Sequence, residues 1–388
     1  MRNYNVYDFA IIGGGISSCV FVYSHFKNGF SGRIAIIENG RQLGGRSSTR
    51  NSLTNNGWKL NHGSPNFNIC NSTNNKLLST FINELLDSNS IQVDSSDVIR
   101  LYDDTLLDSD INSDFYKGTN YISKTYMSQL SQDIISNNNN LRHQVEYFFD
   151  TLIIKLDHEN NQWILTSKNG YEFKSKFLVC SSNLLLHKRS LDILGINHIP
   201  LRKAIPVNKD KKIDKIINLL NEQEYIPRLT FLIYTYSNYS YKDKYKNKYR
   251  YFILSKILED KFKFERIIFQ KQENNKLGIV VHTRNKELIN DFLRNKNINI
   301  LKNKIVLKFN ELFDKNPSIK KIIDYQDISI MKWSSSQPYG LGIPEYLQVC
   351  ENYNIAFCGD WFDLEGFGRV EGAILSALKL SHKINSQF

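Results

Sequence analysis

Residues 7–18 read YDFAIIGGGISS, and this stretch decides the fold. The apolar run Tyr7 to Ile12 ends in three glycines, which is typical of a buried parallel strand followed by a tight turn. The residues from Ile16 to Phe26 then favour a helix. A glycine loop in this position lets backbone N–H groups approach a pyrophosphate, whose charge the helix N-terminus stabilises. The stretch therefore predicts a dinucleotide-binding turn, with contacts at Gly13, Gly15, Ile16, Ser17 and Ser18.

Glu38 strengthens the prediction of a dinucleotide site. A second apolar run, Arg33 to Ile37, predicts a strand that ends at Glu38, about 20 residues beyond the glycine loop. A carboxylate there accepts hydrogen bonds from ribose hydroxyls and repels a 2′-phosphate, so NADP is disfavoured. Asn39 is included among the predicted contacts. Ser18 stands where Gly or Ala is usual, and a side chain this small should be tolerated. The competing interpretation is an ordinary strand, turn and helix without a ligand.

The composition is that of a globular chain of 388 residues, long enough for two packed units. The net charge of +11 favours an anionic partner, but no nucleic-acid-binding module is recognisable, so nucleic acid is not expected. The five cysteines form no C-x-x-C pair, which argues against a disulfide framework and a zinc site and favours a reducing cytoplasm. No stretch approaches the roughly 20 apolar residues of a membrane span. We expect a cytoplasmic protein, with a monomer slightly favoured.

The middle of the chain predicts further strands. Apolar runs between residues 152 and 180 would form a β-meander, in which Asn169-Gly170 is a strong hairpin turn. Residues 202–324 alternate aromatic-rich strands with helical stretches, which indicates a second domain. The segment Tyr239 to Tyr251 mixes lysines with tyrosines. Such a segment can stack and neutralise single-stranded nucleic acid, but a solvated hairpin is the favoured interpretation.

Several motifs resemble, in family order, those of the amine-oxidase-like flavoproteins and their renalase-like branch. Leu43 to Arg46 (LGGR) is similar to the family's L-G-G-R motif. Asn61 to Ser64 (NHGS) resembles D-H-G-A, and Lys332 to Pro338 (KWSSSQP) resembles R-W-R-Y-x-Q-P in the renalase-like branch. Gly359 to Trp361 (GDW) and Gly368 to Ala373 (GRVEGA) closely resemble the G-D-W and G-R-V-E-G-A segments of that branch.

The resemblance implies FAD, bound non-covalently, as the cofactor. Arg46 would pair with the FAD phosphates, because a guanidinium fork fits phosphate geometry. Asp360 would accept hydrogen bonds from the ribityl hydroxyls. The helix that begins near Gly372 and Ala373 would direct its N-terminus at the flavin N1–C2=O edge. Cys358 would pack within its strand instead of attaching to the ring. The other contacts that the resemblance implies are Gly45, Ser47, His62, Gly63, Ser64, Ile153, Gly359, Arg369 and Val370.

The resemblance also implies His62, Trp333 and Gln337 as candidate catalytic residues, with Trp361 and Arg369 facing the flavin. His62 would tune the flavin or act as a base, or it would be a structural histidine bonded to the backbone of its own turn. The two tryptophans would wall the flavin ring or pack in the core. The family's substrate does not transfer directly, because the chain departs from the family at Asn61, Ser334-Ser335 and Pro65-Asn66.

We therefore predict an α/β fold with an α+β second domain. A Rossmann-type FAD-binding domain with a β-meander would comprise residues 1–75, 125–200 and 330–388. A discontinuous substrate domain, with a mixed or antiparallel sheet and helices, would comprise residues 76–124 and 201–329, where the chain shows almost no resemblance to the family.

The predicted function is that of a renalase-like FAD-dependent oxidoreductase. A small reduced nitrogen-containing substrate, with reduced nicotinamide isomers as the leading class, would give a hydride to flavin N5. Oxygen or another acceptor would reoxidise the flavin. The alternatives are a flavin amine oxidase or desaturase on the same fold, and a non-catalytic FAD-binding protein that serves as a partner or assembly factor. The substrate, the electron acceptor and the oligomeric state are left open.

Overall fold

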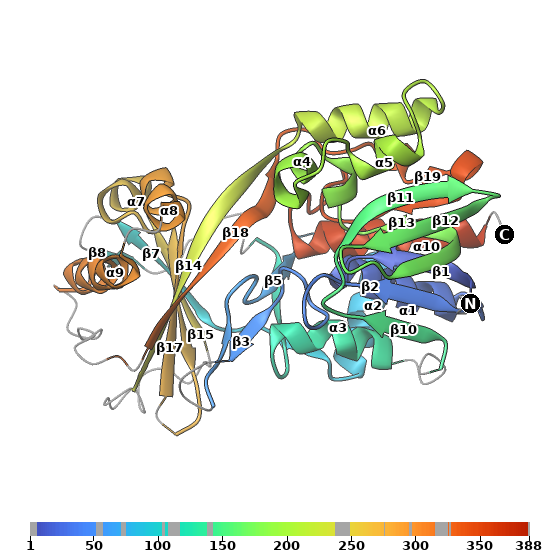
Figure 1. Cartoon of the computed structure of the whole chain (residues 1–388). Coiled ribbons are helices and arrows are strands. Elements are labelled where there is room, and N and C mark those ends of the chain that lie inside the picture. Colours follow the sequence, from blue (N-terminus) through green and yellow to red (C-terminus); the bar gives the residue numbers. More distant parts are fainter. Residues whose placement is uncertain are drawn as a thin grey trace.

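The computed structural model describes residues 6–51, 57–70, 75–102, 105–107, 117–137, 143–236, 249–274, 276–294, 297–314, 325 and 327–386. These residues form two large sheets with helices packed around them (Figure 1). The N-terminal stretch is strand β1 (Val6–Ile12), helix α1 (Ile16–Lys27) and strand β2 (Ile34–Ile37). Because β1 and β2 pair in parallel, the predicted β-α-β unit is confirmed.

The first sheet has the strand order β10-β2-β1-β13-β12-β11, with β20 beside β13 and β19 beside β20. β1 pairs in parallel with β2 and β13, and β13 pairs in parallel with β20, so the carboxyl ends of these strands meet at one edge. The predicted β-meander is confirmed, because β11, β12 and β13 are antiparallel neighbours. The bounds are β10 (Val145–Phe148), β11 (Ile153–Glu159), β12 (Gln162–Ser167), β13 (Glu172–Cys180), β19 (Val349–Cys350) and β20 (Ile355–Phe357).

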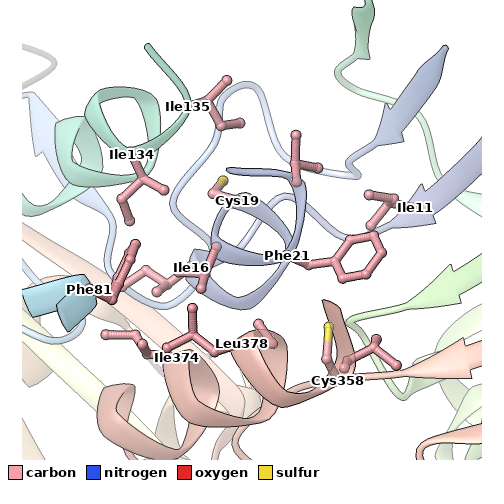
Figure 2. Close-up of a cluster of buried hydrophobic side chains, with 14 of the residues drawn as sticks. Ile11, Ile16, Cys19, Phe21, Phe81, Ile134, Ile135, Cys358, Ile374 and Leu378 are labelled. Carbon is pink, nitrogen blue, oxygen red and sulfur yellow. The ribbon is translucent and has the colours of Figure 1, made fainter. Parts of the chain in front are cut away.

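Helix α1 lies at the centre of the core on one face of this sheet. Figure 2 shows Ile16, Cys19 and Phe21 of α1 surrounded by side chains of the sheet and of three other helices. Cys358 is fully buried in this cluster, as predicted. The three helices are α2 (Lys76–Asp87), α3 (Met127–Ser136) and α10 (Val370–Asn385).

The second sheet is mixed, with the order β18-β14-β17-β16-β15-β7-β8. Its pairs are antiparallel except for β15 and β7. Three helices cover its outer face, and its inner face turns toward the first unit (Figure 1). The bounds are β7 (Asp97–Tyr102), β8 (Thr105–Leu107), β14 (Glu224–Tyr236), β15 (Tyr249–Leu254), α7 (Lys256–Phe262), β16 (Arg266–Lys271), β17 (Lys276–Thr283), α8 (Lys286–Leu293), α9 (Ile298–Leu312) and β18 (Asp327–Tyr339).

The other described elements are two small sheets and further helices and turns. They are β3 (Thr49–Asn51), β4 (Lys59–Asn61), β5 (Phe67–Ile69), β6 (Ile91–Val93), β9 (Thr119–Ser123), α4 (Arg189–Leu194), α5 (Pro200–Ala204), α6 (Lys211–Glu222) and the 3-10 turns Leu184–Leu186, Glu345–Leu347 and Glu351–Tyr353. Among the described helices, none has the length and apolar character needed to cross a bilayer.

The predicted domain boundaries stay a prediction, and two elements cross them. Helix α2 was assigned to the substrate domain, but its apolar face packs in the core around α1, because Leu78, Phe81, Ile82 and Leu85 share one side of the helix. Strand β18 begins before residue 330 and pairs along its length with β14 of the second sheet. Most of the lysine- and tyrosine-rich segment Tyr239 to Tyr251 lies outside the described residues, which resume at residue 249.

Gly278 of β17 marks a tight contact between the units. A Cβ atom at this position would overlap the Leu60 side chain of β4, which is fully buried. Gly278→Ala should therefore lower the free energy of unfolding by about 1–3 kcal/mol, because overpacking a dense contact forces neighbours to shift. Thermal unfolding followed by circular dichroism measures the loss. In a Leu60→Ala background the same substitution should cost much less, and an equal cost in both backgrounds would contradict this contact.

Candidate functional site

A cleft of about 1200 Å³ opens at the carboxyl ends of the parallel strands and reaches the inner face of the second sheet. Gly13, Glu38, Ser181 and Asp360 follow β1, β2, β13 and β20, and all four line the cleft. The carboxyl edge of an open α/β sheet, beside a strand whose neighbours are connected in opposite directions, is where such folds bind ligands. The cleft is also lined by these predicted residues: Gly15, Ile16, Ser17, Asn39, Gly45, Arg46, Ser47, His62, Gly63, Ser64, Trp333, Gln337, Arg369, Val370 and Ala373.

The glycine loop has the shape that a phosphate cradle needs. Gly13 has φ +103°, and a Cβ atom there would lie 2.6 Å from Ser181 Oγ, so no other residue fits without a shift. A Cβ atom on Gly15, the N-cap of α1, would meet no heavy atom within 4 Å, so there is open space beside the N-terminus of α1. Ser18 is fully buried, and its hydroxyl donates to the Gly15 carbonyl at 2.7 Å. This hydrogen bond explains why the motif accommodates serine.

Glu38 lies against the glycine loop. Its Oε2 accepts a hydrogen bond from the Gly14 N–H at 2.6 Å, and its other oxygen accepts from the Gly40 N–H. The loop of residues 43–46 packs on the same turn, because the Gly44 N–H donates to the Gly14 carbonyl at 2.8 Å. The carboxylate therefore occupies the end of β2 where the ribose contact was predicted, and it also fixes the glycine loop.

Arg46 and Asp360 form a two-pronged ion pair, with N–O distances of 2.7 and 2.6 Å. Asp360 is buried, with 4% of its surface exposed, whereas 42% of the Arg46 side chain is exposed to the cleft. Arg46 also donates to the Ser336 carbonyl at 3.2 Å. The residues predicted to hold the phosphates and the ribityl chain are thus brought together by a direct contact.

His62 stacks on Trp333, with ring centroids 5.2 Å apart and an interplanar angle of 27°. Burial, with a smaller contribution from the Arg50 charge, lowers the pKa of His62 to about 4. Its Nε2 lies 3.2 Å from the Ser48 hydroxyl, and its Nδ1 has no hydrogen-bond partner among the described residues. At neutral pH the ring is therefore uncharged and offers a hydrogen-bonding nitrogen that no described group satisfies.

A polar cluster of the second sheet is hydrogen-bonded to the backbone of His62. The Arg266 Nε–H donates to His282 Nδ1 at 2.7 Å, so the ring proton of His282 sits on Nε2, which donates to the His62 carbonyl at 3.1 Å. Burial and the neighbouring Arg266 hold the pKa of His282 well below its usual range. Arg228 pairs with Glu265 at 2.7 and 2.9 Å. Burial alone would raise the pKa of Glu265, but Arg228 lowers it to about 2.

The remaining predicted residues differ in where they lie. Gln337 packs against Gly368, and its Oε1 is 3.5 Å from Arg228. Gly359 and Gly372 do not line the cleft; a Cβ atom on Gly359 would overlap the Trp361 indole. Ile153 is buried in β11, at the edge of the sheet, and does not line the cleft either. Its contact with the cofactor stays a prediction. The backbone N–H of Thr151, two residues before it, donates to the Glu38 carbonyl at 3.0 Å.

Sequence reasoning missed the polar residues that the second sheet and its neighbours contribute. These are Arg50, Arg189, Tyr225, Arg228, Thr230, Arg266 and His282, all of which line the cleft. Most of them lie in the part of the chain without quotable motifs, and strand pairing alone brings them together.

Residues 11–85 match the family model described as an NAD(P)-binding Rossmann-like domain. The comparison with curated proteins gave no match. Cyclohexylamine oxidase from Brevibacterium oxydans has a similar structure, with 11% identity, a TM-score of 0.66 and 99% of each chain covered. A protein assigned as protoporphyrinogen oxidase from an Exiguobacterium species is also similar, with 10% identity, a TM-score of 0.65 and 100% of each chain covered. A redesigned putrescine oxidase has 11% identity and a TM-score of 0.61, with 98% of this chain and 99% of the other covered. The chain therefore has the fold of amine oxidases, as predicted.

His62 should give the stability of the protein a pH dependence of defined sign. Its pKa is about 4 in the folded chain, against 6.5 for an unperturbed histidine. Between these values the unfolded chain binds a proton that the folded chain does not, so acidification across this range destabilises the fold. His62→Gln should remove up to about 3 kcal/mol of this loss, measured by urea unfolding at pH values on both sides of the range. His198→Gln at an exposed site is the control, and an equal effect of both substitutions would contradict the prediction.

Proposed function

We propose that the chain is an FAD-dependent oxidoreductase. The observation that carries the proposal is the meeting of two remote segments, the glycine loop at residues 13–18 and residues 359–373, in one cleft. The first segment supports a dinucleotide, and the second supports a flavin at the far end of it. The similarity in fold to a cyclohexylamine oxidase and a putrescine oxidase agrees with a redox function.

The residues present fit FAD. The open backbone at Gly15 and the N-terminus of α1 would bind the pyrophosphate, and Glu38 would accept the ribose hydroxyls. Asp360 and Arg46 would hold the ribityl chain and a phosphate. The N-terminus of α10 at Val370 would stabilise negative charge at the flavin N1–C2=O edge. The cleft of about 1200 Å³ exceeds the ~300–1,000 Å³ usual for a small-ligand pocket, which leaves room for a substrate. When bound, FAD supplies a hydride acceptor at flavin N5.

The substrate in this proposal is a small reduced nitrogen-containing compound, with reduced nicotinamide isomers as the leading class. His62 is uncharged at neutral pH because its pKa is about 4, so it would orient the substrate by a hydrogen bond and would not act as a strong base. A substrate that loses a hydride without prior deprotonation suits such a site. Trp333, stacked on His62, would form an aromatic wall for a planar ring. Oxygen or another acceptor would complete the cycle.

The second candidate is a flavin amine oxidase, which the solved structures of similar fold favour. The cleft argues against a cationic substrate. The arginines among its described lining residues are Arg41, Arg46, Arg50, Arg189, Arg228, Arg266 and Arg369. The carboxylates that line it are Glu38 and Asp360, and Asp360 is already paired with Arg46.

Glu38 tests the cofactor half of the proposal. Glu38→Ala removes the predicted ribose acceptor and the hydrogen bonds to Gly14 and Gly40, so the dissociation constant of FAD should rise at least ~10-fold. Flavin fluorescence during titration of the apoprotein measures it. Glu159→Ala, at an exposed position at the end of β11, is the control and should bind FAD as the wild type does. Unchanged FAD affinity in Glu38→Ala would contradict the assigned role.

Anaerobic reduction tests the substrate half. Reduced nicotinamide isomers mixed with the oxidised holoprotein should bleach the flavin absorbance within the mixing experiment, whereas cyclohexylamine and putrescine should not. Bleaching by the amines alone would instead establish the amine-oxidase candidate. A holoprotein that no compound of either class reduces, and that captures a stable partner, would establish the non-catalytic alternative.

A further inference from the structure

A row of side chains crosses four strands of the second sheet and faces the cleft. Arg266 of β16 is the cross-strand neighbour of His282 of β17, which neighbours Thr230 of β14, which neighbours Met331 of β18. Side chains directly opposite each other in antiparallel pairs lie on the same face of the sheet. All four line the cleft, so the row forms one continuous wall of it. We call this row the polar wall.

Hydrogen-bond donors around the polar wall lack acceptors. Thr230 Oγ1, Arg50 Nε and Trp333 Nε1 are buried and have no hydrogen-bond partner among the described residues. The same holds for His62 Nδ1, which can donate or accept. Arg50 reaches over the wall, where its Nη1 meets the Met331 sulfur, a weak acceptor. Buried polar groups are satisfied in nearly all proteins, so a set of donors without acceptors indicates a ligand rich in acceptors.

The charge of Arg50 also indicates that the ligand is an anion. Arg46, Arg228 and Arg369 each pair with a carboxylate, from Asp360, Glu265 and Glu371 in turn. Arg50 is half-buried, and none of the described carboxylates lies within ion-pair distance of it. A guanidinium removed from water without a counter-ion is costly, and a ligand anion would supply one. Arg50 also lies close to the His62–Trp333 stack, because β3 pairs with β4 and places Arg50 opposite Leu60, two residues before His62.

We propose that the polar wall and Arg50 bind an anionic group, a carboxylate or a phosphate, of the substrate. The inference rests on the proposed function, because it places this group beside the flavin of an oxidoreductase. Arg50 is the charged anchor, Thr230 and the Trp333 N–H are neutral donors, and the reactive part of the substrate lies against the His62–Trp333 stack. The phosphates of FAD are also anionic groups that Arg50 could bind. Those phosphates belong at the glycine loop, however, and Arg50 lies against the second sheet.

The test uses the oxidised holoprotein and three probes of one shape: benzoate, phenyl phosphate and benzylamine. Binding is measured by calorimetry and by perturbation of the flavin absorbance. At least one anion should bind ~10-fold or more tightly than benzylamine, and the tighter of the two anions identifies the carboxylate or the phosphate. Arg50→Gln should weaken that anion at least ~10-fold, and Arg50→Lys should fall between, since it keeps the charge but loses the planar fork.

Arg294→Gln, which removes the same charge at an exposed site at the end of α8, is the matched control and should bind the anions as the wild type does. The proposal is overturned if benzylamine binds as tightly as the anions, if neither anion binds at millimolar concentration, or if Arg50→Gln matches Arg294→Gln. It is also overturned if Arg50→Gln releases FAD while it still binds the anions, because Arg50 would then serve the cofactor. Calorimetry reports anion binding with or without a flavin, so a protein that carries no flavin would contradict the proposed function and leave this test intact.

Discussion

The contacts of Arg46 join the segments on which the cleft depends. Its side chain bonds both carboxylate oxygens of Asp360, after β20, and the Ser336 carbonyl of β18. Its own carbonyl accepts from the Ser64 N–H at 2.9 Å, and Gly63 is needed there because a Cβ atom would overlap that carbonyl. One residue thus sets the position of the His62 turn, the β18 wall and the end of β20 relative to the glycine loop. The pairing also neutralises a buried aspartate that would otherwise be costly to hold in its charged form.

The two sides of the cleft have different electrostatics. The first unit contributes the partial charges of helix N-termini, the Glu38 carboxylate and the Arg46–Asp360 ion pair. On the second sheet, Arg228 is compensated by Glu265, and His282 stays neutral because burial and Arg266 hold its pKa low. Arg50 and Arg189 are half-buried cations of the cleft that pair with none of the described carboxylates. The cleft therefore combines a neutral aromatic stack with a localised positive charge, and both would orient a planar substrate that carries an anion.

The parts of the fold that could be predicted from the sequence are those with local patterns. The β-α-β unit follows from the apolar runs and the three glycines, and the meander follows from short strands with Asn and Gly at the turns, where Asn160, Asn161 and Gly170 adopt positive φ. It could also be predicted from the sequence that Glu38 and the segment 359–373 meet the glycine loop at one cleft, because they carry a recognisable spacing and short motifs. The assignment of these residues to FAD remains a proposal.

The polar wall could not be predicted, because its members meet only through the register of four strands. Arg50 carries no motif, and its position beside Met331, 281 residues away, depends on how the two units pack. The register between β18 and β14 was also difficult to predict, because it is irregular. Between the pairs Ile226–Gln337 and Arg228–Trp333, β14 has one residue, whereas β18 has three. The strand therefore bulges at the serines of the KWSSSQP motif. The departure of these serines from the family motif coincides with that bulge.

The charges in the cleft favour some substrates of the proposed oxidoreductase over others. An amine oxidase must accept a substrate that is cationic in water, and it would have to bring that cation past Arg50 and Arg189, neither of which is paired with a carboxylate among the described residues. A substrate with an anionic anchor gains from the same residues. With His62 uncharged and of low basicity, the driving force for hydride loss would have to reside in the substrate itself. A reduced heteroaromatic ring meets this requirement, because loss of a hydride restores its aromaticity.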